Sequence, residues 1–258
     1  MFRVLDDRPG SHPAVSLARP GPLRMYVHVR ASADPADLTG LRVLLTADLL
    51  FSAAELGGLQ VLATRVFSGD PAGRDLVERA AAAAGVHPPA GPAADLAKAW
   101  PGGPSDVHVA DDSAAGPDDR SGILVRAAAA RLARDACPGD ATGATLGGND
   151  PLAVRFALMS LPRQQPAELT AGILAGAART LGEWRRQVAR WAESPSSAIP
   201  APVAATLQSA FESQDIIAVL ALLSGLAADE TARPGARFET FVYADRVLGL
   251  DLPRDIGR

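Results

Sequence analysis

Lysine, cysteine and long apolar runs are almost absent from this sequence of 258 residues. Of its 25 lysine and arginine residues, only Lys98 is a lysine, a usage typical of high-GC genomes such as those of actinobacteria. The single cysteine, Cys137, excludes an internal disulfide and a zinc site built from several cysteines. What remains is an alanine- and arginine-rich sequence with 48% hydrophobic and 21% charged residues, a balance typical of a globular protein.

No stretch reaches the roughly 18 consecutive apolar residues of a membrane-spanning helix, and the nearest, residues 216–227, is too short. The opening residues, MFRVLDDRPGSHP, lack the apolar centre of a secretory signal. We therefore expect a cytoplasmic protein that makes no contact with a membrane. The net charge of −4 counts against tRNA binding, because proteins that bind nucleic acids usually carry a basic surplus.

Strand and helix patterns alternate in the first half of the chain. Residues 23–29 (LRMYVHV) and 59–67 (LQVLATRVF) are typical of strands, and residues 41–58 between them have apolar side chains at helical spacing. A strand, a helix and a strand at this spacing predict a βαβ unit with two parallel, buried strands. We expect a further helix over 70–84 and a third strand over 106–110.

The segment that follows the third strand is expected to be helical and then to end in a linker. Residues 123–136 show amphipathic spacing, with Arg126, Arg131 and Arg134 on the polar side of the predicted helix. A short helix is also expected over 93–100.

Small residues dominate 138–148, which predicts a linker between two domains, one over 1–146 and one over 147–258. The second domain is expected to be helical throughout. Asp150-Pro151 is typical of a helix start, because aspartate caps the first amides and proline has no amide to leave unbonded. Apolar residues recur at helical spacing along a long helix expected over 166–193, and this stripe consists of Leu181, Trp184, Val188 and Trp191. Further helices are expected over 202–213, 215–229 and 237–250.

These patterns predict an α/β fold with a reduced parallel sheet, followed by an antiparallel helical bundle. Two blocks of sequence, PGPLRMYVHV over 20–29 and GGNDPLAVRFALMSLPRQQPAELTAGILAGAARTLGEWRRQ over 147–187, resemble cysteinyl-tRNA synthetase and its relative, the mycothiol-pathway cysteine ligase. The resemblance implies a Rossmann-like class I catalytic domain and the helical domain after it. Family members adenylate cysteine with ATP and pass it to tRNA or to a glucosamine-inositol acceptor.

The motifs that handle ATP and zinc in that family are altered in this sequence. His28 stands where the family has a zinc-ligating cysteine, and Asp37-Leu38-Thr39-Gly40 lies over the HIGH signature without either histidine. The family's lysine-bearing KMSKS loop corresponds to CPGDATGATLGGND over 137–150, which has no lysine or arginine. Adenylation needs positive groups aimed at the phosphates of ATP, whereas the negative charge of Asp37 would repel those phosphates. We therefore expect neither a metal nor a cofactor.

Each of these residues also has a local structural interpretation. Asp37 or Thr39 could cap a helix, Asp70-Pro71 is typical of a helix start, and His28 fits a buried or cleft-lining histidine.

Three hypotheses about function remain open. In the first, the chain is a catalytically degenerate paralogue that binds a small molecule, a full-length synthetase or a second copy of itself. In the second, it is a minimal cysteine ligase with a rewired site at the strand ends, where open α/β sheets bind ligands. The candidate residues for a cleft there are His28, Arg30, Asp34, Asp37 and Asp70. In the third, it is a tRNA-binding accessory protein that uses Arg179, Arg185, Arg186 and Arg190, which otherwise form a solvated helix face.

Overall fold

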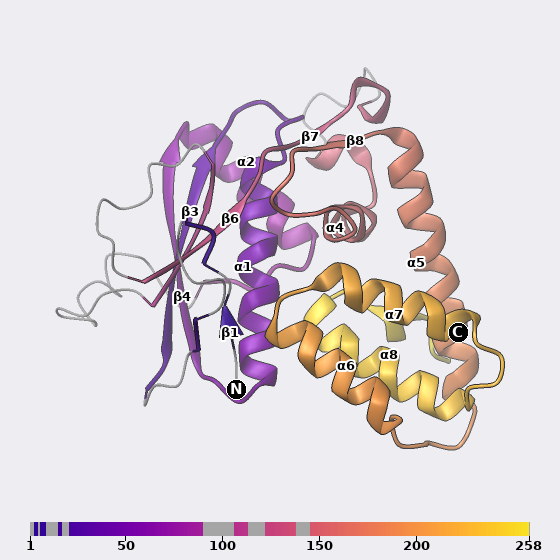
Figure 1. The fold of residues 1–258 in the computed structure, drawn as a ribbon. Helices are drawn as coiled ribbons and strands as arrows, with labels where there is room; N and C mark the ends of the chain where they lie inside the picture. Colours follow the sequence, from indigo (N-terminus) through magenta and orange to yellow (C-terminus); the bar gives the residue numbers. More distant parts are fainter. Residues whose placement is uncertain are drawn as a thin grey trace.

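The computed structural model describes residues 3–4, 6–8, 15–16, 21–89, 106–112, 122–137 and 145–257. Over these residues the chain is an α/β protein, with a parallel sheet packed against helices and a group of C-terminal helices beyond them (Figure 1). The expected fold class, a reduced Rossmann-like sheet followed by helices, is confirmed. The helix expected over 93–100 lies outside the described residues.

The sheet has four parallel strands in the order β4-β3-β5-β6. They are β3 (Leu23–Ala31), β4 (Val61–Gly69), β5 (Val107–Asp111) and β6 (Ile123–Ala127). The first three were expected. A separate antiparallel pair joins β1 (Arg3–Val4) to β2 (Val15–Ser16). Because the chain passes from β3 to β4 on one side and later to β5 on the other, the strand order reverses between β3 and β5.

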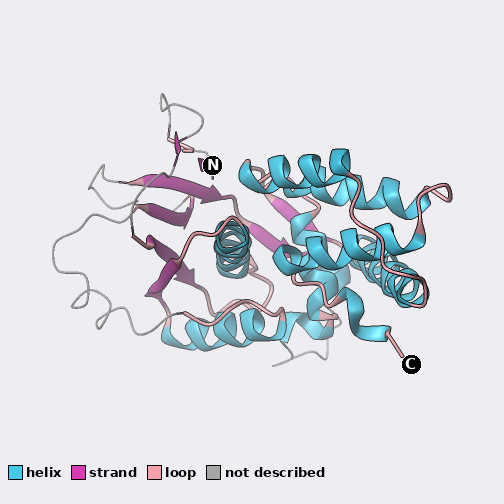
Figure 2. Ribbon diagram, turned by 90° about the horizontal axis from the view of Figure 1, so that it is seen from below, coloured by secondary structure: helices cyan, strands magenta, loops and turns pink. Residues whose placement is uncertain are grey.

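Alternating burial along β3 shows which face of the sheet the helices cover. Leu23, Met25, Val27 and Val29 are at most 5% exposed, whereas the side chains between them face the other way. Helices α1 (Thr39–Leu56) and α2 (Pro71–Ala83) pack on the covered face, and a Cβ added to Gly40 of α1 would lie only 3.2 Å from Val29 Cγ1. Figure 2 shows the sheet and the C-terminal helices on opposite sides of α1. Helix α1 is therefore the central element of the molecule.

The prediction of a helix over 123–136 is wrong. That segment forms β6, a short strand β7 (Ala130–Leu132) and a single turn, η1 (Arg134–Ala136). Residues 123, 125 and 127 pair with β5 and are almost fully buried. This burial of every second residue is typical of a strand and not of an amphipathic helix. Partners distant in the sequence decided the outcome, since a sheet edge offers backbone hydrogen bonds that local spacing does not reveal.

The start of the long helix expected over 166–193 is also corrected. Residues 167–169 form the strand β8 (Ala167–Leu169), which runs parallel to β7, and the helix α5 (Ala171–Ala192) begins only after it. Thr170 caps α5 by accepting a hydrogen bond from the Ile173 amide. Residues 167–169 have no helical spacing of their own, so the proline before them marked the end of a turn rather than a helix start.

The remaining helices lie close to the expected positions. They are α4 (Pro151–Met159), α6 (Ala201–Glu212), α7 (Ile216–Ala228) and α8 (Pro234–Leu248), with short turns η2 (Thr145–Gly148) and η3 (Leu252–Asp255). Asp150 caps α4 through the Leu152 amide, as expected. The apolar stripe of α5 is buried, and Trp184 and Trp191 pack edge-on against Phe241 of α8 at centroid distances of 5.4 and 5.1 Å.

Buried side chains from both halves of the chain form one continuous hydrophobic cluster. Helix α1 packs on the sheet with one side and contacts α6 and α8 with another. Two domains over 1–146 and 147–258 remain a prediction. None of the helices in the described residues combines the length and the hydropathy that crossing a bilayer requires.

Candidate functional site

The three aspartates predicted at the strand ends bind neighbouring backbone amides. Oδ1 of Asp34 accepts a hydrogen bond from the Ala36 amide, that of Asp37 from the Thr39 amide and that of Asp70 from the Ala72 amide, each at 2.9 Å. The last of these bonds is the expected cap of α2. The Asp34 and Asp37 carboxylates thus stabilise turns before α1, which has no side-chain cap, and the Asp70 carboxylate stabilises a helix start.

Close backbone packing fills the space between the ends of β3 and β4. A Cβ on Gly73 would lie 2.5 Å from the carbonyl carbon of Ser32, and one on Gly69 would overlap the carbonyl oxygen of Ala31. Gly69 also has a φ of 93°, a conformation that favours glycine. The loop after β3 therefore lies directly on the start of α2, without room for a ligand between them.

His28 lies on the face of the sheet away from α1, where it contacts a second histidine. Its Nε2 is 3.0 Å from Nδ1 of His108 on β5, and the two rings are stacked with centroids 5.2 Å apart. Burial lowers the pKa of His28, which favours the neutral ring. Among the described residues no hydrogen bond or ion pair joins His28 to the three aspartates. Within the same part of the chain, no group of three or more histidine, cysteine, aspartate or glutamate side chains could hold a metal. Arg30, the remaining candidate, is exposed at the end of β3.

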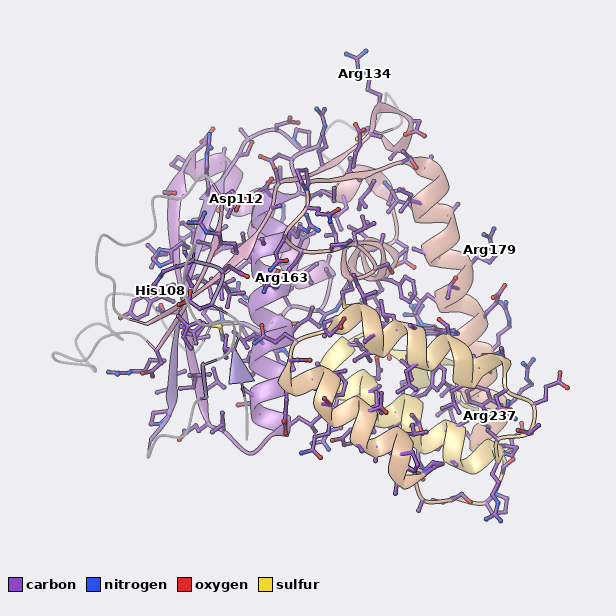
Figure 3. The ribbon with its side chains drawn as sticks, viewed as in Figure 1. His108, Asp112, Arg134, Arg163, Arg179 and Arg237 are labelled. Atoms are coloured by element: carbon purple, nitrogen blue, oxygen red, sulfur yellow. The ribbon has the colours of Figure 1, made fainter. Side chains whose placement is uncertain are left out.

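The proposed arginine face of α5 loses one member. Arg179, Arg186 and Arg190 are exposed, and Figure 3 shows Arg179 directed away from the helical core. Arg185 is buried instead, with Nη2 donating to Leu250 O at 2.7 Å and Nε to Asp251 O at 3.1 Å. It falls four residues after Leu181 on the buried side of the helix, and this spacing could have revealed it.

A cleft that the sequence did not reveal lies between α1, α4 and the turn that connects α6 to α7. Its volume is about 330 Å³, within the range of small-molecule sites. Leucines of α1 and the end of α4 supply most of its apolar wall, and Ile216 and Ile217 of α7 complete it. Ile217 is 41% exposed, an unusual exposure for a large apolar side chain. The arginines that line the cleft are Arg42 and Arg163.

Arg42 is a buried charged residue of α1, 2% exposed and flanked by Leu41 and Val43. Its Nη2 donates to Pro162 O, and its Nη1 donates to Gln165 O, both at 2.7 Å, and to Ala128 O at 3.1 Å. These bonds attach α1 to the segments that precede β7 and β8. Burial, followed by the nearby charge of Arg163, lowers the pKa of Arg42. Even so, an arginine side chain stays protonated in proteins.

Arg163 carries the second positive charge of the cleft and already binds a carboxylate. Both of its terminal nitrogens donate to Asp7, and Nη1 also donates to Arg126 O at 2.6 Å. Nε2 of Gln164 donates to the same carboxylate at 2.7 Å, as does the Arg126 amide. Figure 3 places Arg163 beside α1. Two guanidinium groups thus line the cleft, and that of Arg163 binds a carboxylate.

A second buried polar cluster ties the helices together behind the cleft. Arg155 of α4 is 1% exposed and donates to Asp48 of α1 at 2.6 Å, to Leu248 O at 2.6 Å and to Ala84 O at 3.0 Å. Nδ1 of His87 is 2.7 Å from Asp48. Burial alone would raise the pKa of Asp48, but the His87 hydrogen bond and the Arg155 charge lower it overall. The hydrogen bond to Asp48 raises the pKa of His87.

Comparison with known proteins adds no relative. No family model matches the sequence, and a search of curated proteins finds no match. The resemblance to cysteinyl-tRNA synthetase therefore remains a prediction, carried by the residues quoted for it.

Proposed function

We propose that this chain is a non-catalytic binding protein whose small-molecule ligand occupies the cleft between α1, α4 and α7. The observation that carries the proposal is the cleft itself, about 330 Å³ in volume and lined by apolar side chains around a buried arginine. Ligand sites are usually concave, largely apolar and supplied with a few fixed polar groups. In this proposal the fold derives from a degenerate synthetase, as the sequence predicts, but the ligand binds in the cleft and not at the strand ends.

The contacts of the candidate cleft residues at the strand ends support binding over catalysis. Asp34, Asp37 and Asp70 each hold a backbone amide, and close glycine contacts occupy the space beside them. The second hypothesis, a minimal cysteine ligase, predicts cysteine-dependent exchange of pyrophosphate into ATP. We expect no exchange above background, and clear exchange would replace our proposal with an enzyme.

The third hypothesis, tRNA binding through α5, now depends on Arg179, Arg186 and Arg190, which stay exposed. It predicts a gel shift with tRNA that weakens steeply as salt rises. With a net charge of −4 we expect no shift at physiological salt.

Binding of a neutral apolar dye, N-phenyl-1-naphthylamine, tests the cleft directly, because its fluorescence rises in an apolar site. We expect saturable binding by the full chain. Leu49→Trp should fill part of the cleft, and Ile217→Ser should remove apolar surface at its rim, so both should weaken binding.

The matched control is Ile173→Ser on α5. Ile173 is 38% exposed, close to the 41% of Ile217, and it does not line the cleft. The Ile173→Ser variant should therefore bind the dye as tightly as the unaltered protein. The proposal fails if the dye does not bind, or if the variants of Ile173 and Ile217 weaken binding equally.

A further inference from the structure

Arg42 differs from two other buried arginines in the hydrogen bonding of its Nε atom. Arg42, Arg155 and Arg185 are each at most 7% exposed. Nε of Arg155 donates to Leu248 O and Nε of Arg185 donates to Asp251 O. Among the described residues, the buried Nε of Arg42 has no hydrogen-bond partner. An unpaired buried donor is costly and is usually satisfied by protein, water or ligand.

The charge of Arg42 is also not neutralised directly. Its guanidinium group donates to neutral backbone carbonyls, and none of the ion pairs between described residues includes it. Arg155, by contrast, forms an ion pair with Asp48. Burying a cation without an anion is unfavourable, so a position next to Arg42 favours negative charge.

The neighbouring Arg163 shows which anion fits this end of the cleft. It binds the Asp7 carboxylate with two nitrogens, and Gln164 adds a third donor. A carboxylate has the planar shape that a guanidinium group binds best.

The other carboxylates near Arg42 are engaged elsewhere. Asp112, whose charge acts on Arg42, pairs with Arg126 at 3.6 Å. Asp215, which lines the cleft, accepts a hydrogen bond from the Ala218 amide. Among the described residues no carboxylate pairs with Arg42 itself.

Much of the remaining lining of the cleft is apolar, and it includes Leu45, Leu49 and Leu50 of α1 together with Met159 and Ile216. From these observations we infer that the ligand is a small carboxylic acid with an apolar tail, its carboxylate bound at Arg42 and its tail along α1. This inference rests on the proposed function, because it assigns a ligand class to the same cleft. Linear acids of about eight carbons are suitable probes for a site near the lower size limit of small-molecule pockets.

The test compares octanoate, 1-octanol and octylamine as competitors of N-phenyl-1-naphthylamine at neutral pH. The three probes share the same tail and differ in the charge of the head group. We expect octanoate to bind about tenfold more tightly than 1-octanol, since hydrogen bonds to charged groups contribute more than neutral ones, and octylamine to bind most weakly.

Variants then locate the head group. Arg42→Gln should bring the affinities of octanoate and 1-octanol close together while 1-octanol itself binds as before. Arg179→Gln, on the exposed side of α5, should retain the full preference for the acid. If Arg42→Gln does not fold, as judged by circular dichroism, the order of the three competitors on the unaltered protein decides.

Two results would overturn the inference. One is 1-octanol binding as tightly as octanoate, and the other is a preference for octanoate that survives in folded Arg42→Gln. In both cases the proposed function would still stand if the dye binds and Ile217→Ser weakens it. Loss of dye binding itself would remove the proposed function together with the inference.

Discussion

Two adjacent arginines of α5 illustrate how much a single residue's environment matters. Arg185 donates to the carbonyls of Leu250 and Asp251, whereas Arg186 is exposed. Arg185→Met should lower the free energy of unfolding by about 2–3 kcal/mol, because it leaves buried carbonyls without donors. Arg186→Met should change it by less than about 0.5 kcal/mol. Urea unfolding followed by circular dichroism measures both, and equal effects would contradict the burial of Arg185.

His87 and Asp48 predict a dependence of stability on pH. Because the folded-state pKa of His87 is raised, its contribution is fully present below the unfolded value of about 6.5 and is lost as pH rises through the folded pKa. The pKa of Asp48 is lowered, so its contribution is present above about 3.9 and is lost as pH falls through the folded pKa. Their interaction is therefore strongest between these two limits.

His87→Gln tests this sign, since glutamine takes up no proton and the backbone bond from residue 87 to Asp48 is kept. The His87 side chain is 55% exposed, so solvent screens the ion pair and its contribution is limited to about 0.5–1 kcal/mol. Thermal unfolding at about pH 5.5 and pH 9 should show the larger loss at the lower pH. A loss of the same size at both values would show that the ring's charge contributes nothing.

At the scale of elements, a substitution at the start of α2 can test whether Asp70 has a structural role or belongs to a ligand site. Its side chain accepts from the Ala72 amide, and Pro71 occupies the first helical position. Asp70→Ala should cost about 1 kcal/mol, the typical effect of losing a helix cap. Asp75→Ala, at an exposed position within α2, should cost less than about 0.5 kcal/mol.

Dye binding to the cleft should be the same in both variants, because neither residue lines it. A loss of binding in Asp70→Ala at unchanged stability would return the site to the strand ends.

The elements that sequence predicted correctly are those whose signals are local. Asp150-Pro151 and Asp70-Pro71 start helices as expected, and the stripe through Trp184 and Trp191 is buried. The errors concern β6, β7 and β8, which pair with strands outside their own segments, β6 with β5 and β7 with β8. Such pairing leaves little trace in the spacing of one segment, and residues 123–136 fitted a helix equally well.

At the scale of the whole molecule, the buried cluster of Asp48, Arg155 and His87 joins α1, α4 and the end of α2. Asp48→Asn leaves the charge of Arg155 buried without a carboxylate and should cost about 3 kcal/mol or more. Because one hydrophobic cluster spans both halves of the chain, the loss should affect both together.

Two probes can follow the unfolding of both halves in a Trp100→Phe background, where only the fluorescence of Trp184 and Trp191 in the helical part remains. Urea unfolding curves from tryptophan fluorescence and far-ultraviolet circular dichroism should coincide, and Asp48→Asn should shift them equally. Separate midpoints would favour two independent domains with a boundary near residue 146.

The cleft could not be predicted from sequence because its walls come from three separate regions. Arg42 gave a signal, as a charged residue within the apolar run LRVLLTADLLF, but its acceptors at Pro162, Gln165 and Ala128 are distant in the chain. The predicted residues His28, Arg30, Asp34, Asp37 and Asp70 do lie on or after β3 and β4. His28 contacts His108, and the three aspartates each bind a nearby backbone amide.

Hydrophobic periodicity, helix-start residues and turn glycines are properties of short segments. The βαβ unit, most of the helices and the α/β class could therefore be predicted from the amino-acid sequence alone. Strand pairing, the burial of Arg42 and Arg185 and the position of the cleft depend on contacts between segments far apart in the chain. Those contacts are selected by the total free energy of packing and of satisfied hydrogen bonds in the folded chain, which no single segment contains.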